Sequence, residues 1–266
     1  MPMTGTVKGL FGHSVFASGL HSALLRNSAV VAVFHHIRDG AAGDSLSIDV
    51  DMFERYCRFF RQHFRVVSLP HLVSKLERHE RLQRELVITF DDGYLDNFEN
   101  AAPILERYSL PATFFVVTEW MGSTVVPWWD RESVTCPKWM TWDQVRSLHR
   151  RGFDIGGHTQ THADLGLVSG ETAAREIAGG RASLSERIGA PVSSFAYPYG
   201  GRHNVTEDNR QLIRDAGFRC CCSGFGGHNV SGSNPFHINR VAISSWYASP
   251  HQFGFEVAMG LSQLSA

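Results

Sequence analysis

Two neighbouring carboxylates, Asp91 and Asp92, follow a strongly apolar run at residues 86–88. One carboxylate disfavours the charge on its neighbour unless a cation or a proton relieves the repulsion. Two imidazoles four residues apart, His158 and His162, could help to hold such a cation. One Asp and two His form a three-ligand set with an open position, which is typical of a catalytic zinc-type site that activates water. The second Asp would then be free to act as a base.

Each motif also has an ordinary structural interpretation. Asp-Asp-Gly at 91–93 is typical of a turn, because Asp and Gly both favour turn conformations. The chain contains 14 histidines, so one His-x-x-x-His pair is weak evidence by itself. Both motifs nevertheless follow predicted strands, and in barrels and open sheets the carboxyl ends of the strands carry the active site. The combination therefore favours a metal-dependent hydrolase.

A third motif completes a resemblance to a known family. Residues 89–93 read Thr-Phe-Asp-Asp-Gly, residues 158–162 read His-Thr-Gln-Thr-His, and residues 195–200 read Phe-Ala-Tyr-Pro-Tyr-Gly. With these motifs in this order, the chain resembles the polysaccharide deacetylases of carbohydrate esterase family four, the NodB-homology domain, over roughly residues 29–245. The resemblance implies an α/β fold, a distorted (β/α)7-type barrel in a single domain, and removal of acetyl groups from saccharides.

The resemblance also implies roles for individual residues. Asp92, His158 and His162 would bind one divalent ion, most naturally zinc, with cobalt, nickel or iron as alternatives. Asp91 would be the general base. The backbone N–H of Tyr199 would stabilise the tetrahedral oxygen. The residues expected to contact the substrate are Pro198, Tyr199, Trp128 and Trp129.

Two departures from the family pattern point to one branch of it. Many members carry an Arg two residues before the Pro of the third motif, where this chain has Ala196. The chain also lacks a clear Leu-x-His near its C-terminus, which usually supplies the general acid. Both features resemble the enzymes that deacetylate poly-N-acetylglucosamine, in which part of the site is circularly permuted. In that branch, His35 would be the acid and Arg240 would replace the missing Arg beside Asp91.

The competitor of His35 is its neighbour His36. Side chains alternate between the two faces of a strand, so only one of the pair can point into the barrel mouth. We expect His35 in the mouth, across the substrate pocket from the base, and His36 outward or in packing. The alternative is that both are supporting or surface histidines.

The irregular segment 119–140 holds four tryptophans, including Trp128 and Trp129. Aromatic side chains near an active face can stack on the apolar faces of sugar rings, or they can pack a long loop. Beside them, Asp130 could bind a sugar hydroxyl or pair with Arg131. The sequence leaves these alternatives open.

Length and composition limit the class of protein. With 266 residues, the chain is long enough for one domain of barrel size. The 25 basic and 26 acidic residues nearly balance, which disfavours nucleic acid as a partner, and no apolar run is long enough to span a bilayer. The tandem cysteines at 220–222 resemble neither a disulfide framework nor a spaced zinc site, so we expect small buried residues in a strand. With no pattern of a signal peptide, we predict a location in the cytoplasm, or at the inner face of its membrane.

The chain divides into an N-terminal segment, 1–28, and the deacetylase domain, 29–266. The N-terminal segment is predicted to be helical and to pack on the barrel; contact with a membrane surface is the alternative. Its apolar residues at loosely helical spacing are Leu10, Phe11, Val15, Phe16, Leu20, Leu24 and Leu25.

From residue 30 on, predicted strands and helices alternate, which indicates parallel β/α architecture. The predicted strands are 30–34, 65–67, 86–90, 112–117, 153–156, 194–197, 218–222 and 238–243. The predicted helices are 52–64, 69–78, 95–108, 142–151, 171–188 and 206–216. A capping box at 141–144 marks the start of the fourth helix, and glycines at 152, 189 and 217 mark three helix ends.

The leading functional hypothesis is removal of an N-acetyl group from an N-acetylhexosamine unit of a saccharide or lipid-linked saccharide. The first alternative is another C–N hydrolase on this scaffold, such as a deformylase or a cyclic-amide hydrolase. The second is a non-catalytic carbohydrate-binding protein. The intact Asp91 disfavours the second alternative, since binding alone does not need a base.

Overall fold

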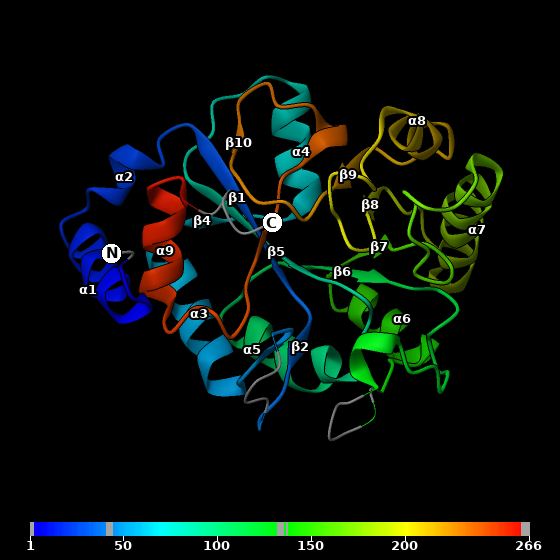
Figure 1. Cartoon of the computed structure of the whole chain (residues 1–266), viewed down its shortest axis with the longest axis horizontal. Coiled ribbons are helices and arrows are strands. Elements are labelled where there is room, and N and C mark those ends of the chain that lie inside the picture. The colour runs from blue at the N-terminus through cyan, green and yellow to red at the C-terminus, as the bar shows by residue number, and fades with distance from the viewer. Residues whose placement is uncertain (1–2, 41–44, 132–135, 137, 262–266) are drawn as a thin grey trace.

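The computed structural model describes residues 3–40, 45–131, 136 and 138–261 of the chain. Its centre is a curled sheet in the order β10-β1-β5-β6-β7-β8-β9, with β4 beside β5 and β11 beside β1 (Figure 1). The strands are β1 Ser28–Phe34, β2 His36–Ile37, β3 Ser47–Ile48, β4 Arg65–Val66, β5 Glu85–Phe90, β6 Thr113–Val116, β7 Asp154–Gly157, β8 Ser194–Ala196, β9 Cys220–Cys222, β10 Asn229–Val230 and β11 Val241–Ala242.

Helices surround this sheet, and Figure 1 shows α1, α2 and α9 gathered at one side of it and α6, α7 and α8 at the other. The α-helices are α1 Gly5–Ala17, α2 His21–Leu24, α3 Val50–His63, α4 Leu69–Glu77, α5 Ala102–Arg107, α6 Trp142–Arg150, α7 Gly170–Ile188, α8 Glu207–Asp215 and α9 Pro250–Ala258. A π-helical turn covers Asn97–Ala101, and two 3₁₀ turns cover Trp128–Asp130 and Pro235–His237. Within the described residues, no helix is long and apolar enough to cross a membrane.

Both faces of the central strands are buried, which explains why these strands read as continuous apolar runs. Even-numbered residues of β1 and β5, such as Val30 and Ile88, belong to a core shared with the surrounding helices. Odd-numbered residues, such as Val31 and Val87, belong to a second core with α4 and with residues of β9. The alternation continues past the ends of the strands, so odd-numbered residues there face the interior of the barrel.

The segment 238–242 links the two edges of the curled sheet. Ile238 forms a bridge to Cys222 of β9, and β11 pairs in parallel with Ala32 and Val33 of β1. Because this segment carries Arg240, its placement decides which side chains the arginine can reach. The sheet therefore has the distorted (β/α)7-type barrel architecture in one domain that the sequence predicts.

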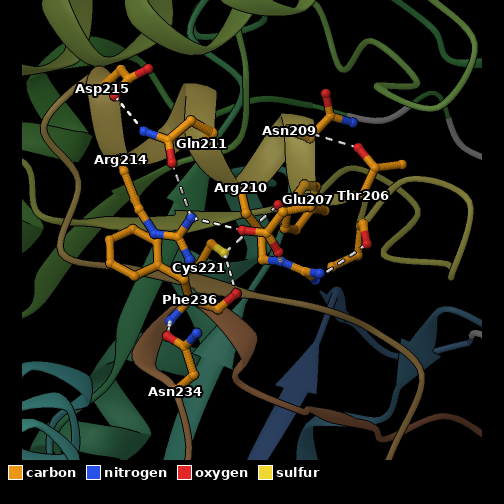
Figure 2. Close-up of polar contacts among 12 residues, drawn as sticks. Thr206, Glu207, Asn209, Arg210, Gln211, Arg214, Asp215, Cys221, Asn234 and Phe236 are labelled. Carbon is orange, nitrogen blue, oxygen red and sulfur yellow. Dashed lines mark hydrogen bonds and ion pairs between the residues drawn. The ribbon is translucent and has the colours of Figure 1, made fainter.

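Contacts from α8 fix the turn before this segment, as Figure 2 shows. The Arg214 guanidinium lies over the Phe236 ring, 4.7 Å from its centroid. The Phe236 N–H donates to the Asn234 side chain at 2.9 Å, and the Cys221 thiol donates to the Phe236 carbonyl at 3.1 Å. All three cysteines of β9 are buried free thiols, in agreement with the sequence prediction.

The predicted helices and strands of the barrel are present, with boundaries shifted by a few residues. The capping box is formed by Thr141 and Gln144, and the glycines at 152, 189 and 217 have φ values of 90°, 72° and 92°. The short strands β2, β3 and β10 and the last helix, α9, were not predicted from the sequence. Residues 132–135 and 137 of the irregular segment, and residues 262–266 of the predicted domain, lie outside the described residues.

The N-terminal helices form as predicted, but most of their apolar residues are not packed on the barrel. Phe16 and Leu25 are buried, whereas Leu10, Phe11, Leu20 and Leu24 are exposed. The reason is that α1 contacts α9 through glycines. A Cβ atom on Gly12 would lie 2.0 Å from the His251 carbonyl oxygen, so only a glycine face allows this close approach.

Candidate active site

The carboxyl ends of β1, β5, β7 and β8 meet around one pocket of about 380 Å³. Residues from all four strand ends line it. The pocket wall consists of Val33, His35, Ser45, Leu46, Asp91, Asp92, Trp128, Trp129, His158, His162, Tyr197, Tyr199, Gly224, Arg240 and Ala242. Most of the residues that the sequence singles out are thus brought together, although they come from segments more than 200 positions apart.

Asp92, His158 and His162 converge on one point. The Asp92 Oδ1 atom lies 3.4 Å from His158 Nε2 and 3.3 Å from His162 Nε2. Ligands bound tetrahedrally at about 2.1 Å from a zinc ion lie roughly 3.4 Å from one another. Asp92 Oδ1 is buried and has no hydrogen-bond partner among the described residues, so a cation would satisfy it. The donor set and its spacing therefore fit a divalent ion.

The ring of His158 is oriented by a contact on its far side. Its Nδ1 atom lies 2.8 Å from the Ala196 carbonyl oxygen, so Nδ1 carries the hydrogen and Nε2 faces Asp92. Burial alone would lower the pKa of His158, but the Asp91 and Asp92 carboxylates raise it. Burial alone would likewise raise the pKa of Asp92, but His158 and His162 bring it well below its usual range. Asp92 therefore stays ionised, which favours a cation, whereas a bound cation would have to displace the proton that the raised pKa favours on His158.

Asp91 does not point at this group but forms a two-point ion pair with Arg240. The Nη1 and Nη2 atoms of Arg240 each donate to one Asp91 oxygen at 2.7 Å. The Nε atom donates to the Ser223 carbonyl at 2.8 Å, which fixes the plane of the guanidinium. Burial alone would raise the pKa of Asp91, but the Arg240 charge lowers it, so the carboxylate stays ionised. Arg240 thus occupies the place beside Asp91 that the resemblance implies.

His35 and His36 lie on opposite faces, as the alternation predicts. His35 lines the pocket, and burial lowers its pKa against the opposing effect of Asp92 and Asp91. His36 is buried in packing, with its ring centroid 3.5 Å from that of Tyr94. The expectation that His35 lies across the pocket from the base is wrong. Phe34 pairs with Phe90 in the sheet, so His35 follows on the strand next to that of Asp91.

A polar network that was not predicted from the sequence lies behind the pocket. The Asp96 carboxylate accepts from the Ile37 N–H at 3.0 Å and lies 2.6 Å from His36 Nδ1. Asn97 donates to the His35 carbonyl at 2.6 Å. These contacts anchor the segment that carries His35. Their signal in the sequence is the polar pair Asp96-Asn97, which follows the Asp-Asp-Gly motif after Tyr94 and Leu95.

The network continues to the tryptophan segment through Asp130. The Tyr94 hydroxyl donates to Asp130 at 2.9 Å and accepts from the Trp129 indole N–H at 3.0 Å. Asp130 is buried, and its other oxygen lies 3.7 Å from His36 Nε2. Neither of the roles that the sequence left open for Asp130, sugar binding or pairing with Arg131, matches these contacts. Asp130 instead ties the segment to the barrel.

Aromatic side chains form the outer wall of the pocket. Trp128 is 65% exposed, whereas Trp129 is half-buried with its ring centroid 4.9 Å from that of His162. Tyr199 is exposed and packs against His162 at 4.8 Å between centroids. Pro198, which was expected to contact substrate, is buried and does not line the pocket. A tight turn, in which the Gly200 N–H donates to the Pro198 carbonyl at 2.7 Å, presents Tyr199 to the pocket instead.

Backbone strain is concentrated at this pocket. Asp92, Thr159, His162 and Tyr199 have φ values of 74°, 64°, 61° and 62°. Residues other than glycine adopt this left-handed region at a cost of about 1–3 kcal/mol, and such residues cluster at functional sites. The strain aims the side chains of the three motifs at one point.

Comparisons with known proteins agree with this architecture. A model of the polysaccharide deacetylase family matches residues 78–221, more than half of the chain. The poly-beta-1,6-N-acetyl-D-glucosamine N-deacetylase of Staphylococcus aureus (strain MSSA476) is 24% identical over 208 residues, 74% of this chain and 68% of that protein. The structure of IcaB from Ammonifex degensii has a TM-score of 0.72 and 23% identity, covering 89% of this chain and 97% of that one. The Streptococcus pyogenes deacetylase PplD in complex with acetate has a TM-score of 0.71 and 20% identity, covering 85% and 96%. The chain belongs to the polysaccharide deacetylase family.

Proposed function

We propose that this chain is a metal-dependent N-deacetylase that hydrolyses the acetamido group of an N-acetylhexosamine unit in a saccharide. The observation that carries the proposal is that the two neighbouring aspartates make different contacts. Asp92 faces two histidines at spacings suited to a divalent ion, and Asp91 is turned away from them and held by Arg240. A protein that only binds sugars needs neither arrangement.

Asp92, His158 and His162 would hold the ion, with zinc the first choice and cobalt, nickel or iron as alternatives. When bound, such an ion lowers the pKa of water and polarises a carbonyl oxygen. The protein has to place the acetamido carbon against a water molecule that also lies within reach of Asp91. The half-enclosed pocket beside both aspartates provides that place.

The proton transfers are assigned to Asp91 and His35. Asp91 accepts a proton from the attacking water as the new C–O bond forms. The C–N bond then breaks, and the departing amine takes a proton from His35, so acetate and a free amino sugar result. The backbone N–H of Tyr199 is the proposed donor to the tetrahedral oxygen. Trp128, Trp129 and Tyr199 form the proposed platform for the sugar ring.

A screen for acetate release tests this proposal. The purified protein is stripped of metal, reloaded with zinc, cobalt, nickel or iron, and offered N-acetylglucosamine units from monomer to oligomer, with lipid-linked forms included. We expect metal-dependent acetate release that Asp91→Asn abolishes. Formate release from N-formyl substrates, or turnover of cyclic amides without acetate release, would favour the alternative hydrolases. Tight sugar binding without any turnover would favour a binding protein.

The location of the protein stays a prediction. The five cysteines that the sequence contains are free thiols in the structure, which is the state expected in a reducing compartment. A location in the cytoplasm is therefore proposed, and fractionation of cells that produce the native full-length chain would test it.

A further inference from the structure

Helix α1 carries three exposed apolar side chains along one side. At about 100° per residue, Val7, Leu10 and Phe11 of α1 fall within one arc of about 100°. All three are exposed, Leu10 to 67% and Phe11 to 54%, and so is Met3, which precedes the helix. No charged residue lies within this arc. This set, together with the exposed Leu20 and Leu24 that follow, is called the N-terminal apolar stripe.

The packed side of α1 explains why the stripe is not part of the core. Gly5, Gly9, Gly12 and Phe16 fall on the opposite side of the helix, and the glycines lie against α9. The Phe16 ring contacts Phe59 with centroids 4.8 Å apart. The glycines and Phe16 make this contact. Within the stripe, the Phe11 ring also lies near α9, with its centroid 6.2 Å from that of Phe255, but Phe11 stays 54% exposed. Contiguous exposed apolar surface of this kind marks an interaction site.

A cationic pocket adjoins the stripe. Four arginines line a pocket of about 340 Å³ that contains no carboxylate among its lining residues. The lining residues are Ser22, Arg26, Asn27, Arg65, Arg81, Leu82, Gln83 and Arg84. Arg84 donates to the Ser22 hydroxyl, and Arg65 donates to the Gln83 side chain at 3.0 Å. Ser22 lies in α2 between Leu20 and Leu24, so the arginine pocket lies beside these two exposed leucines of the stripe.

We propose that the apolar stripe and the arginine pocket together form a docking surface for a bilayer that contains anionic phospholipids. Leucine and phenylalanine side chains enter the boundary between headgroups and acyl chains, as in helices that lie on membranes. Guanidinium groups bind the lipid phosphates with two-point hydrogen bonds. A second copy of the chain fits this surface less well. A two-fold contact through the stripe would bring two arginine pockets together without carboxylates to neutralise them.

The docking surface and the candidate active site lie at opposite ends of the same strand. Arg84 precedes β5 and Asp91 follows it, and six strand residues span about 20 Å. Docking therefore leaves the pocket with Asp91 uncovered. The proposal does not depend on the proposed reaction, because it concerns residues that the pocket does not contain.

Vesicle flotation tests the proposal. The native protein should float with phosphatidylcholine–phosphatidylglycerol vesicles and much less with phosphatidylcholine vesicles, and added salt should weaken the binding. We expect Leu10→Ser/Phe11→Ser to weaken it at least about tenfold through lost apolar burial. Arg26→Gln/Arg81→Gln should also weaken it about tenfold or more, since each basic residue contributes near an anionic surface.

Matched variants separate this surface from general effects of charge and apolarity. Leu167→Ser removes another exposed leucine, and Arg150→Gln/Arg175→Gln removes the same charge from α6 and α7. Both should float like the native protein, and circular dichroism should show all variants folded. The proposal is overturned if the native protein does not float with anionic vesicles, or if the matched variants lose as much binding. Equal flotation of the native protein with neutral and with anionic vesicles would show that the arginines do not contribute to binding. A dimer detected by light scattering and abolished by Leu10→Ser/Phe11→Ser would assign the stripe to a second copy instead.

Discussion

Arg240 reaches both oxygens of Asp91, at 2.7 Å each, from a position 149 residues further along the chain. Both side chains are buried, so neither charge could be left without the other. The pair holds the carboxylate ionised and fixes its orientation beside the group formed by Asp92, His158 and His162. This geometry makes Arg240 a positioning residue for the proposed base.

Substitutions of Arg240 should separate the effect of its positive charge from the effect of its two-point contact with Asp91. Arg240→Met leaves Asp91 buried without its partner and should reduce the free energy of unfolding by about 3–5 kcal/mol. Arg240→Lys keeps a positive charge but offers only a point contact, so the protein should be more stable than the Met variant and still lose most activity. Urea unfolding and the pH profile of acetate release measure the two effects. If the Lys variant matched the native enzyme in kcat, two-point positioning of Asp91 would not matter.

Metal binding should depend on Asp92 and His162 but not on Asp91. At a zinc concentration of 100 times the dissociation constant, binding adds about 2.7 kcal/mol to the stability, which raises Tm by roughly 5–10 °C. Asp92→Asn and His162→Ala should lose this shift and the bound metal measured by elemental analysis. Asp91→Asn is the matched control, which should retain the metal while kcat falls at least about a hundredfold. Loss of the ion from Asp91→Asn would mean that the two aspartate roles are reversed.

His35→Ala and His36→Ala should affect different properties. His35→Ala should slow amide hydrolysis by about 10²–10⁴-fold, yet spare an activated acetyl ester, whose leaving group needs little protonation. His36→Ala should instead lower the stability, because Asp96 and Asp130 lose the ring that lies between them. Rates on both substrates and thermal unfolding distinguish the two. Equal losses of His35→Ala on the amide and the ester would give His35 a structural role.

Tyr94→Phe should weaken substrate binding more than it slows turnover. The substitution removes the hydroxyl that accepts from the Trp129 indole and donates to Asp130. Trp129 lines the pocket, so its looser placement should raise KM several-fold while kcat changes little. Trp128→Ala tests the exposed ring directly and should also raise KM. An unchanged KM in both variants would leave the tryptophans with a packing role only.

Acid should destabilise the protein through the histidines around Phe16. Burial and the neighbouring His21 and His251 lower the pKa of His63 to about 4. Between the ordinary histidine pKa of about 6.5 and this value, the unfolded chain binds a proton that the folded chain does not. The stability therefore falls as the pH falls through this window. In thermal unfolding across this range, His63→Gln should show a shallower decline, whereas His71→Gln, an exposed residue of α4, should not. A decline equal to that of the native protein would exclude His63 as its source.

The sequence by itself determined the local geometry of this protein. Apolar runs ending in charged motifs placed Asp91, Asp92 and His158 at the ends of buried strands, because the side-chain pattern of a strand is read from its own consecutive residues. The same alternation separated His35 from His36. Helix ends were predictable for the same reason, since a cap such as Thr141 or a left-handed glycine acts within one turn.

Only the tertiary structure decided which distant segments meet. The ion pair between Arg240 and Asp91 requires the segment 238–242 to lie against β1, and the sequence supported it through family resemblance alone. The link from Trp129 through Tyr94 to Asp130 has no pattern along the chain. The exposure of Leu10 and Phe11 in α1 was not predictable either, because apolar spacing does not reveal which side of a helix meets the protein. That choice was made by Gly5, Gly9 and Gly12, whose missing side chains let α9 approach on the opposite side.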